Sequence, residues 1–305
     1  MTIEIDQSAV RLFQPWEEDI ESWALFQAMA NELTDRYRER EMVWRGARRA
    51  DWGVMSSLYR TLYGHLGRPP TEDELNTAEE KMLALARRDW RFDGMPALET
   101  MAHLQHFGAP TRLLDVSENP LIALWFAVDG SEVDDRFDSR LFAFVTHERA
   151  ISLNERWYGR DPHWHKLHDD LARRAAKWGT GLGRRVWRPP AFNSRISSQN
   201  AAFLIDGVPL DAEQHGHGRK SPETDETWTA EEMSQANSIP LKVTKIREGT
   251  LADSSAPVFT FRIRAEAKKE IRDQLERRYG YRASSIYSDM NGLASYLAAR
   301  PDLLV

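Results

Sequence analysis

The chain is organised around residues 102–128, where a helical apolar pattern leads through a polar turn into an almost uncharged run. Apolar residues three apart, followed by Gly108, predict a short helix before the turn, with Leu98, Met101 and Leu104 on one face. Pro110 disfavours a helical conformation at the residue before it, so the chain must turn there. Asn119-Pro120, in the order of an N-cap and a first-turn proline, then predicts a second, buried helix. The polar residues of the turn are therefore expected to lie between two apolar elements.

The same patterns predict the elements on either side of this stretch. Helices are expected over residues 15–40, 71–90 (opening with a capping box at Thr71), 167–178, 265–279 and 292–299. Strands are expected over residues 42–46, 141–146, 195–206 and 258–264, and the alternation in the last predicts a half-buried strand. Residues 211–235 contain seven carboxylates and few apolar side chains, which predicts a flexible surface loop.

These elements predict a single mixed α+β domain with a small central sheet flanked by helices. We divide the chain into an N-terminal helical segment, residues 1–40, and a domain over 41–300 with insertions at about 150–190 and 211–235. No repeat and no clean linker interrupts the pattern. A length of 305 residues with 41% hydrophobic content is enough to fill one large core.

Composition excludes several classes of site. The chain has no cysteine, which removes disulfides, thiolate metal ligands and cysteine nucleophiles. The absence of cysteine also fits the cytoplasmic location that we expect. No apolar run approaches the ~18 residues that span a bilayer, so we expect no membrane contact. The net charge of −6 argues against a globally basic nucleic-acid binder but leaves room for a local basic groove.

Several stretches resemble the FRG domain family. They are Trp44-Arg45-Gly46, where the family more often begins with Phe, QHFGAPTRLLD at 105–115, NPLIALWFA at 119–127, RISSQNAAF at 195–203, and the closing residues 286–292. Together they extend from about residue 40 to 297, and the central block is too specific to be a coincidence. The resemblance names a domain without supplying a mechanism, so function has to be argued from the residues.

Arg45 and Gly46 are expected at the end of a strand, where side chains commonly face ligands. A guanidinium offers a planar fork that suits phosphate oxygens. This Arg-Gly pair is similar to the first-strand arginine with which one branch of the ADP-ribosyltransferases holds a phosphate of NAD. The alternative is structural, with Arg45 paired to a core carboxylate such as Asp115. Both interpretations stay open, with Arg45 and Gly46 as candidate NAD-binding residues.

The densest polar cluster near the predicted core comprises Gln105, His106, Thr111, Arg112 and Asp115. Buried charges need partners, so we predict an ion pair between Arg112 and Asp115 that holds the turn. His106, at a helix end, is a candidate general base, and Asp115 is a candidate catalytic carboxylate. Thr111 and Arg112 are further candidates for NAD binding. His103 lies three residues before His106, but without a clear third ligand we predict no metal site.

A late strand is expected to place Arg195, Ser197 and Gln199 on one face, because side chains alternate along a strand. ADP-ribosyltransferases commonly carry a glutamate on such a strand, which binds the nicotinamide ribose. Gln199 would take that place here, although an amide stabilises an oxocarbenium-like charge less well than a carboxylate does. Gln199 is therefore a candidate catalytic residue, and Arg195 a candidate cofactor-binding residue.

Two functions of different classes follow. The first is an NAD-dependent, ADP-ribosyltransferase-like enzyme that modifies a macromolecule, with a matching fold. It would act as a bacterial toxin or phage-defence effector, with NAD as substrate, a nucleic-acid or protein target and a neutralising partner protein. The second is a noncatalytic nucleic-acid- or protein-binding module, whose contact surface is formed by tryptophans and arginines between Trp157 and Arg188. Hydrolysis of a nucleotide or nucleic acid, with His106 as the base, is a further alternative.

Overall fold

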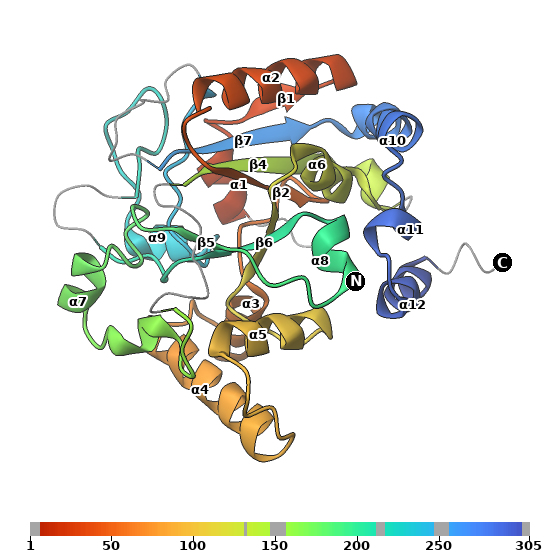
Figure 1. Cartoon of the computed structure of the whole chain (residues 1–305). Helices are drawn as coiled ribbons and strands as arrows, with labels where there is room; N and C mark the ends of the chain where they lie inside the picture. The colour runs from red at the N-terminus through yellow and green to blue at the C-terminus, as the bar shows by residue number, and fades with distance from the viewer. Residues whose placement is uncertain (1–6, 131–132, 147–156, 212–216, 247–255, 301–305) are drawn as a thin grey trace.

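In the computed structural model, the described residues are 7–130, 133–146, 157–211, 217–246 and 256–300. They form an α+β domain around a seven-stranded sheet of order β1-β7-β4-β2-β3-β6-β5 (Figure 1). The strands are β1 (Glu18–Ile20), β2 (Met42–Ala47), β3 (Leu114–Ser117), β4 (Ser139–Val145), β5 (Arg185–Trp187), β6 (Ala201–Ile205) and β7 (Val258–Ile263). The sheet is mixed, since β1 runs parallel to β7 whereas the other neighbouring pairs are antiparallel.

Three helices cover one face of the sheet: α2 (Trp23–Arg36), α6 (Pro120–Val128) and α10 (Ala265–Tyr279). The central helix α6 begins as its sequence predicts, because the Asn119 side chain accepts a hydrogen bond from the Leu121 amide and Pro120 occupies the first turn. It carries no charge and packs against α10 as well as β2 and β4. This face of the sheet forms the largest apolar core, into which Trp44 and Trp125 both point.

The opposite face of β2, β4 and β7 is covered by α1 (Gln7–Phe13), α9 (Ala230–Ser234) and residues 236–243. Both faces of the central strands are therefore buried. This explains why β7 is a strand as predicted but is not half-buried: Thr260, expected to face outward, is 1% exposed and accepts a hydrogen bond from Arg140.

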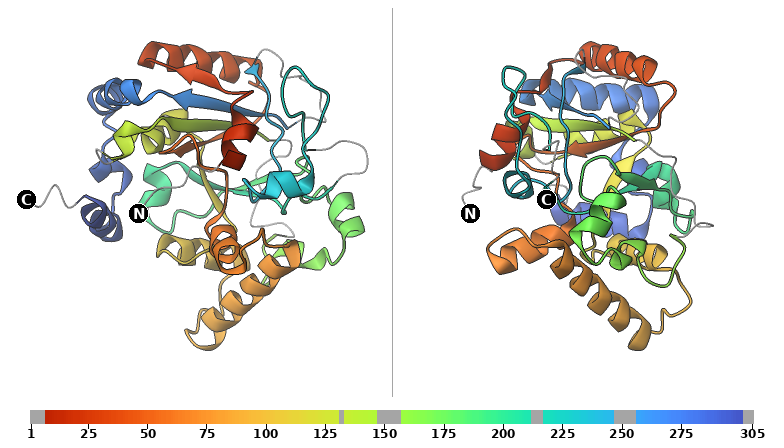
Figure 2. Two further views of the ribbon diagram at one scale, coloured as in Figure 1. Left: turned by 180° about the vertical axis from the view of Figure 1, so that it is seen from behind. Right: turned by 90° about the vertical axis from the view of Figure 1, so that its left-hand side faces the viewer.

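The remaining helices gather around the β5–β6 end of the sheet and the C-terminal part of the chain. They are α3 (Ser57–Leu66), α4 (Glu72–Arg88), α5 (Ala97–His106), η1 (Asp134–Arg136), η2 (His163–Lys166), α7 (Asp170–Ala175), α8 (Ser194–Ser198), α11 (Ala283–Ile286) and α12 (Met290–Ala299). The long helix α4 lies at the opposite end of the molecule from α2 (Figures 1 and 2). It starts at the predicted capping box, Thr71 with Glu74, but ends before Trp90, which is exposed.

Two predicted elements differ in kind from the structure. The opening helix does not start near residue 15, because Ser22 caps α2 and the residues before it pair in parallel with β7 as β1. The late strand starts at Ala201, not at Arg195. Asn193 accepts a hydrogen bond from the Ile196 amide and so caps a short helix, α8, over the first part of that stretch. The expected single face of Arg195, Ser197 and Gln199 is therefore wrong.

Two segments expected to be helix or loop are also corrected. The predicted helix over 167–178 is reduced to α7, which Asp169 caps at its start. Within 211–235, residues 212–216 lie outside the described residues, but the remainder contains α9 and a bridge between Arg219 and Thr227. His217 in this stretch is 1% exposed, so it does not belong to a surface loop.

The tryptophans expected to form a nucleic-acid contact surface are buried. Trp157, Trp164, Trp178 and Trp187 are each 5% exposed or less and form one core with residues of α4, α5, β5 and β6. Their rings pack on one another, with Trp164 and Trp178 stacked at 5.4 Å. Bases cannot stack on rings that the protein itself covers, so the predicted contact surface is wrong. Among the described residues, no helix combines the length and the apolar character that crossing a bilayer requires.

Candidate functional site

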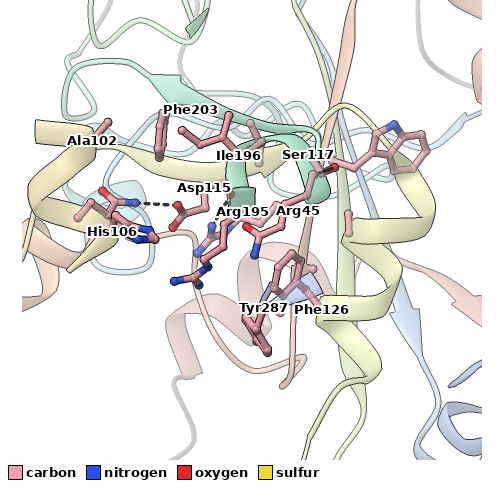
Figure 3. Close-up of a pocket in the computed structure, with 18 of the residues that line it drawn as sticks. Arg45, Ala102, His106, Asp115, Ser117, Phe126, Arg195, Ile196, Phe203 and Tyr287 are labelled. Carbon is pink, nitrogen blue, oxygen red and sulfur yellow. Dashed lines mark hydrogen bonds between the residues drawn. The ribbon is translucent and has the colours of Figure 1, made fainter. Parts of the chain in front are cut away.

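A cavity of about 880 Å³ lies beside the contact between β2 and β3. β2 pairs with β4 at six positions but with β3 at one, Trp44 with Ser117, so the two strands separate on either side of that contact. Residues of β2, β3, α5, α8 and α12 surround the resulting space, with aromatic walls at Phe126 and Tyr287 (Figure 3). The structure brings six of the eight predicted site residues to this cavity: Arg45, Gly46, His106, Asp115, Arg195 and Gln199. Thr111 and Arg112 do not line it.

Asp115 supplies the carboxylate of the cavity. Its neighbours Leu114 and Val116 are buried, whereas Asp115 is exposed, as alternation along β3 requires. Gln105 Nε2 donates to Asp115 Oδ1 over 2.8 Å (Figure 3). Among the described residues that line the cavity, Asp115 is the one acidic side chain. The hydrogen bond from Gln105 holds one carboxylate oxygen of Asp115 against α5, while the side chain as a whole remains accessible.

Thr111 lies one step behind the cavity and controls the orientation of Gln105. The Thr111 hydroxyl donates to Gln105 Oε1, which leaves the amide nitrogen of Gln105 to face Asp115. The position of Thr111 is itself set by α3, because its amide donates to Ser57 Oγ over 2.9 Å. Thr111 thus has a positioning role in this geometry, without direct contact with the cavity.

Arg45 reaches the cavity from β2. Its Nη1 donates to the backbone carbonyl of Asp115 over 2.6 Å, so the two residues are joined through the main chain and not by an ion pair of side chains. Burial lowers the pKa of Arg45 most, whereas the charge of Asp115 raises it. An arginine remains protonated at neutral pH in such a setting. The remaining N–H groups of the guanidinium are available to a ligand.

Gly46 serves the packing of α6. A Cβ at this position would lie 2.0 Å from the carbonyl oxygen of Ala123 and 2.6 Å from the amide nitrogen of Ala127. The helix backbone therefore rests directly on the strand, at a distance that a side chain would prevent. Gly46 also lines the cavity, but its lack of a side chain is explained by this contact.

His106 lies at the end of α5, with 14% of its side chain exposed. Its Nε2 is 3.6 Å from Asp289 Oδ2, and its ring packs edge-on against Phe107. Burial lowers the pKa of His106 below its ordinary value, and the charge of Arg195 lowers it further, while Asp289 opposes this. The imidazole is therefore neutral at pH 7 and can accept a proton.

Arg195 and Gln199 come from α8 and the residue that follows it. The Arg195 guanidinium lies 5.5 Å from the ring centre of Tyr287, with its Nε 3.9 Å from Asp289. Gln199 uses its amide nitrogen to donate to the carbonyl of Ile286 over 3.0 Å, and its own carbonyl accepts from Ser117. Gln199 therefore joins α8 to both β3 and α11. The acidic group on the described cavity wall is Asp115, not a residue of this segment.

The predicted ion pair between Arg112 and Asp115 is wrong. Arg112 points away from the cavity into α4, where its Nε lies 2.8 Å from Glu79 and its Nη1 2.5 Å from Glu72. Arg112 and these two acids are each at most 3% exposed. Trp164 and Trp178 donate to the same carboxylates, so every member of the cluster has hydrogen-bond partners. This cluster is structural and cannot contact a ligand in the cavity.

The histidines His103 and His165 are both held by contacts within the protein. His103 stacks on Phe192 with ring centres 3.8 Å apart, and His165 Nε2 lies 2.9 Å from Glu79 Oε2. Within the part of the chain that the structure describes, no three histidine or acidic side chains converge as a metal site.

Sequence reasoning missed most of the other residues that line the cavity, among them Arg60, Tyr287 and Asn291. Asn291 Nδ2 donates to the backbone carbonyl of His106 over 3.2 Å and so joins α12 to α5. Tyr287 and Asn291 lie in the closing residues 286–292 that the sequence had already singled out, which was the available signal for them. Arg60 offered no comparable signal, since its side chain is brought to the cavity by the position of α3 relative to β2.

Comparison with known proteins bears on the first part of this site. The family model of the FRG domain matches residues 40–136, which include Arg45, His106 and Asp115. Arg195, Gln199 and Tyr287 lie beyond the match. No match was found among curated proteins, and none among solved structures. Residues 40–136 of this chain are thus an FRG domain, and the segments that follow it complete the cavity.

Proposed function

We propose that the protein binds NAD in this cavity and transfers its ADP-ribosyl group to a macromolecule. The observation that carries the proposal is the side-by-side placement of Arg45 and Asp115, a phosphate-binding fork and an accessible carboxylate, in one aromatic-walled cavity. A volume of about 880 Å³ is within the range of cofactor sites. The arrangement supports an ADP-ribosyltransferase-like site, and we propose the same for the fold around it.

The reaction needs little from the protein beyond positioning and charge. The bond between ribose C1′ and the nicotinamide nitrogen breaks, and nicotinamide leaves as a neutral molecule with the bonding electrons. The acceptor forms a new bond to C1′ and loses its proton. In the proposed reaction Asp115 stabilises positive charge that develops on the sugar, and the hydrogen bond from Gln105 supports this by holding the carboxylate. In the same proposal the imidazole of His106 takes the proton of the acceptor, and its lowered pKa supports this because it favours the neutral ring.

A bacterial toxin or phage-defence effector is the setting that we propose for such a transfer, with a nucleic acid or protein as target and a neutralising partner protein. If water is the acceptor, the same residues catalyse NAD hydrolysis. The hydrolase alternative with His106 as the base therefore shares this site and differs in its product. A noncatalytic binding module would retain ligand affinity without turnover.

The experiment is incubation of the full chain with NAD, followed by chromatographic measurement of released nicotinamide. Wild-type protein is expected to release it, and Asp115→Asn to lose this activity while retaining NAD binding and thermal stability. The matched control is Glu118→Gln, three residues along the chain, because Glu118 is exposed and lies outside the cavity lining. An absence of nicotinamide release by the wild type, across a panel of cell extracts as acceptors, would overturn the proposal.

A further inference from the structure

Two arginines from different elements face the same cavity without a carboxylate partner. Arg45 comes from β2 and Arg60 from α3. Each uses Nη1 to donate to a backbone carbonyl, Arg45 to Asp115 over 2.6 Å and Arg60 to Met55 over 2.5 Å. Neither forms an ion pair of side chains within the described residues, and Arg60 is exposed. Most of both guanidinium groups is therefore free to contact a ligand.

Positively charged side chains outnumber negatively charged ones among the described residues that line the cavity. Four arginines and one acid line it: Arg45, Arg48, Arg60, Arg195 and Asp115. Two of the arginines have carboxylates behind the wall, since Arg48 lies 3.3 Å from Asp129 and Arg195 lies 3.9 Å from Asp289. Arg45 and Arg60 share the single charge of Asp115. The described lining of the cavity thus carries an excess of positive charge, to which these two arginines contribute.

Electrostatic effects on Arg45 agree with this geometry. Burial lowers its pKa most, Asp115 raises it, and the charge of Arg60 lowers it again. The charge of Arg60 therefore disfavours the charged form of Arg45 by repulsion, yet both remain protonated at neutral pH. A ligand with two negative charges would relieve that repulsion and would meet two forks suited to its oxygens.

We propose that Arg45 and Arg60 form a subsite for the pyrophosphate of a bound dinucleotide. The inference rests on the proposed function and adds the part of the substrate that these side chains hold. In NAD the pyrophosphate is joined to C5′ of the nicotinamide ribose. A phosphate subsite beside Asp115 therefore leaves that carboxylate next to the ribose, where the proposed transfer needs it.

The test is calorimetric titration of the full chain with ADP, AMP, adenosine and inorganic pyrophosphate. Arg60→Gln is expected to weaken binding of ADP and pyrophosphate by about ten- to a hundredfold, because a charge-assisted, bidentate contact is lost. Adenosine should bind both proteins equally, and AMP should lose less than ADP. Arg60→Lys, which keeps the charge without the fork, should fall between the two. Arg277→Gln is the control, since Arg277 is an exposed arginine on α10 outside the cavity lining.

Thermal unfolding of Arg60→Gln should match the wild type, because the side chain is exposed. Unchanged affinity of this variant for ADP and pyrophosphate, an equal loss for AMP and ADP, or no binding of either diphosphate by the wild type would each overturn the subsite. Nicotinamide release is measured separately. Diphosphate binding that depends on Arg60, without NAD turnover, would overturn the proposed function and leave the subsite in place. NAD turnover that is unaffected by Arg60→Gln would overturn the subsite and leave the proposed function in place.

Discussion

The side-chain amide of Gln105, near the end of α5, donates to Asp115 Oδ1 on β3 over 2.8 Å, across the seven residues 107–113 that separate the two elements. The amide could present either its oxygen or its nitrogen to the carboxylate, and the Thr111 hydroxyl decides between them by donating to the oxygen. The orientation of the cavity carboxylate therefore depends on a residue that never reaches the cavity.

We expect Gln105→Met to lower kcat for NAD turnover about ten- to a hundredfold, because a hydrogen bond to a charged group is lost. The Michaelis constant for NAD should change little, since Gln105 orients Asp115 and is not expected to hold the phosphates. Thr111→Ser retains the hydroxyl and serves as the control, with activity close to the wild type. Steady-state kinetics of the three proteins would check this, and a loss confined to KM would contradict the positioning role.

A second prediction concerns the buried cluster on α4. Arg112→Met should lower the free energy of unfolding by about 3–5 kcal/mol, because Glu72 and Glu79 would be left buried without their cation. Burial by itself would raise the pKa of Glu79, but Arg112 and His165 bring it below its ordinary value, so the group is charged at neutral pH. The loss should therefore be largest near pH 7.

The double variant Arg112→Met with Glu79→Leu should lose less than the sum of the two single variants, since it removes both charges of one pair. Chemical denaturation of the four proteins measures this coupling. Strictly additive losses would show that Arg112 and Glu79 act independently.

The contrast between Arg112 and Asp115 shows how far the sequence could predict the site. Helix starts were predictable where a cap and a periodic pattern coincide, as at Thr71 and Asn119. The partners of a polar residue depend on how the elements pack against one another. For this reason the predicted partner of Arg112 was wrong. The correct partners were visible as acids seven residues apart, on one face of the predicted helix that became α4. Nothing in the sequence around these acids indicates that this face of the helix is buried.

The predicted start of the late strand was wrong for a different reason. Local capping by Asn193 competes with strand propensity, and a polar residue that caps a short helix outweighs alternation over so few positions. Arg195 and Gln199 nevertheless reach the predicted site, because α8 returns the chain to the edge of β6 beside the cavity. The sequence thus singled out these two residues, whereas their secondary structure and side-chain contacts were not predictable from it.

A third prediction separates packing from ligand binding at Gly46. Gly46→Ala should destabilise the protein by about 1–3 kcal/mol or more, because the new Cβ meets the backbone of α6 and the helix must shift. Gly64→Ala is the matched control, since Gly64 lies within α3 with open space around it and alanine favours helix by about 0.5–1 kcal/mol. Denaturant unfolding of both variants checks this. A Gly46→Ala variant of normal stability with impaired NAD binding would show that the glycine serves the ligand instead.

The last prediction concerns His106, whose pKa lies below its ordinary value of 6.5 because of burial first and the charge of Arg195 second. A general base must be neutral, so activity should be full above this pKa and fall as pH drops through it. The acid limb of kcat against pH should therefore have its midpoint below pH 6.5. Asp289 raises the pKa, so Asp289→Asn should move the limb to still lower pH.

His106→Gln should abolish this limb and lower kcat by about a hundredfold or more, since the proton acceptor is lost. The substitution leaves the His106 backbone carbonyl in place, so the hydrogen bond from Asn291 that joins α12 to α5 is kept and the fold should be unchanged. A purely structural role would give the opposite pattern, with full turnover and an unaltered pH profile in His106→Gln. An acid limb that persists in that variant would assign the titration to another group, and His106 would then be no more than a contact between α5 and Asp289.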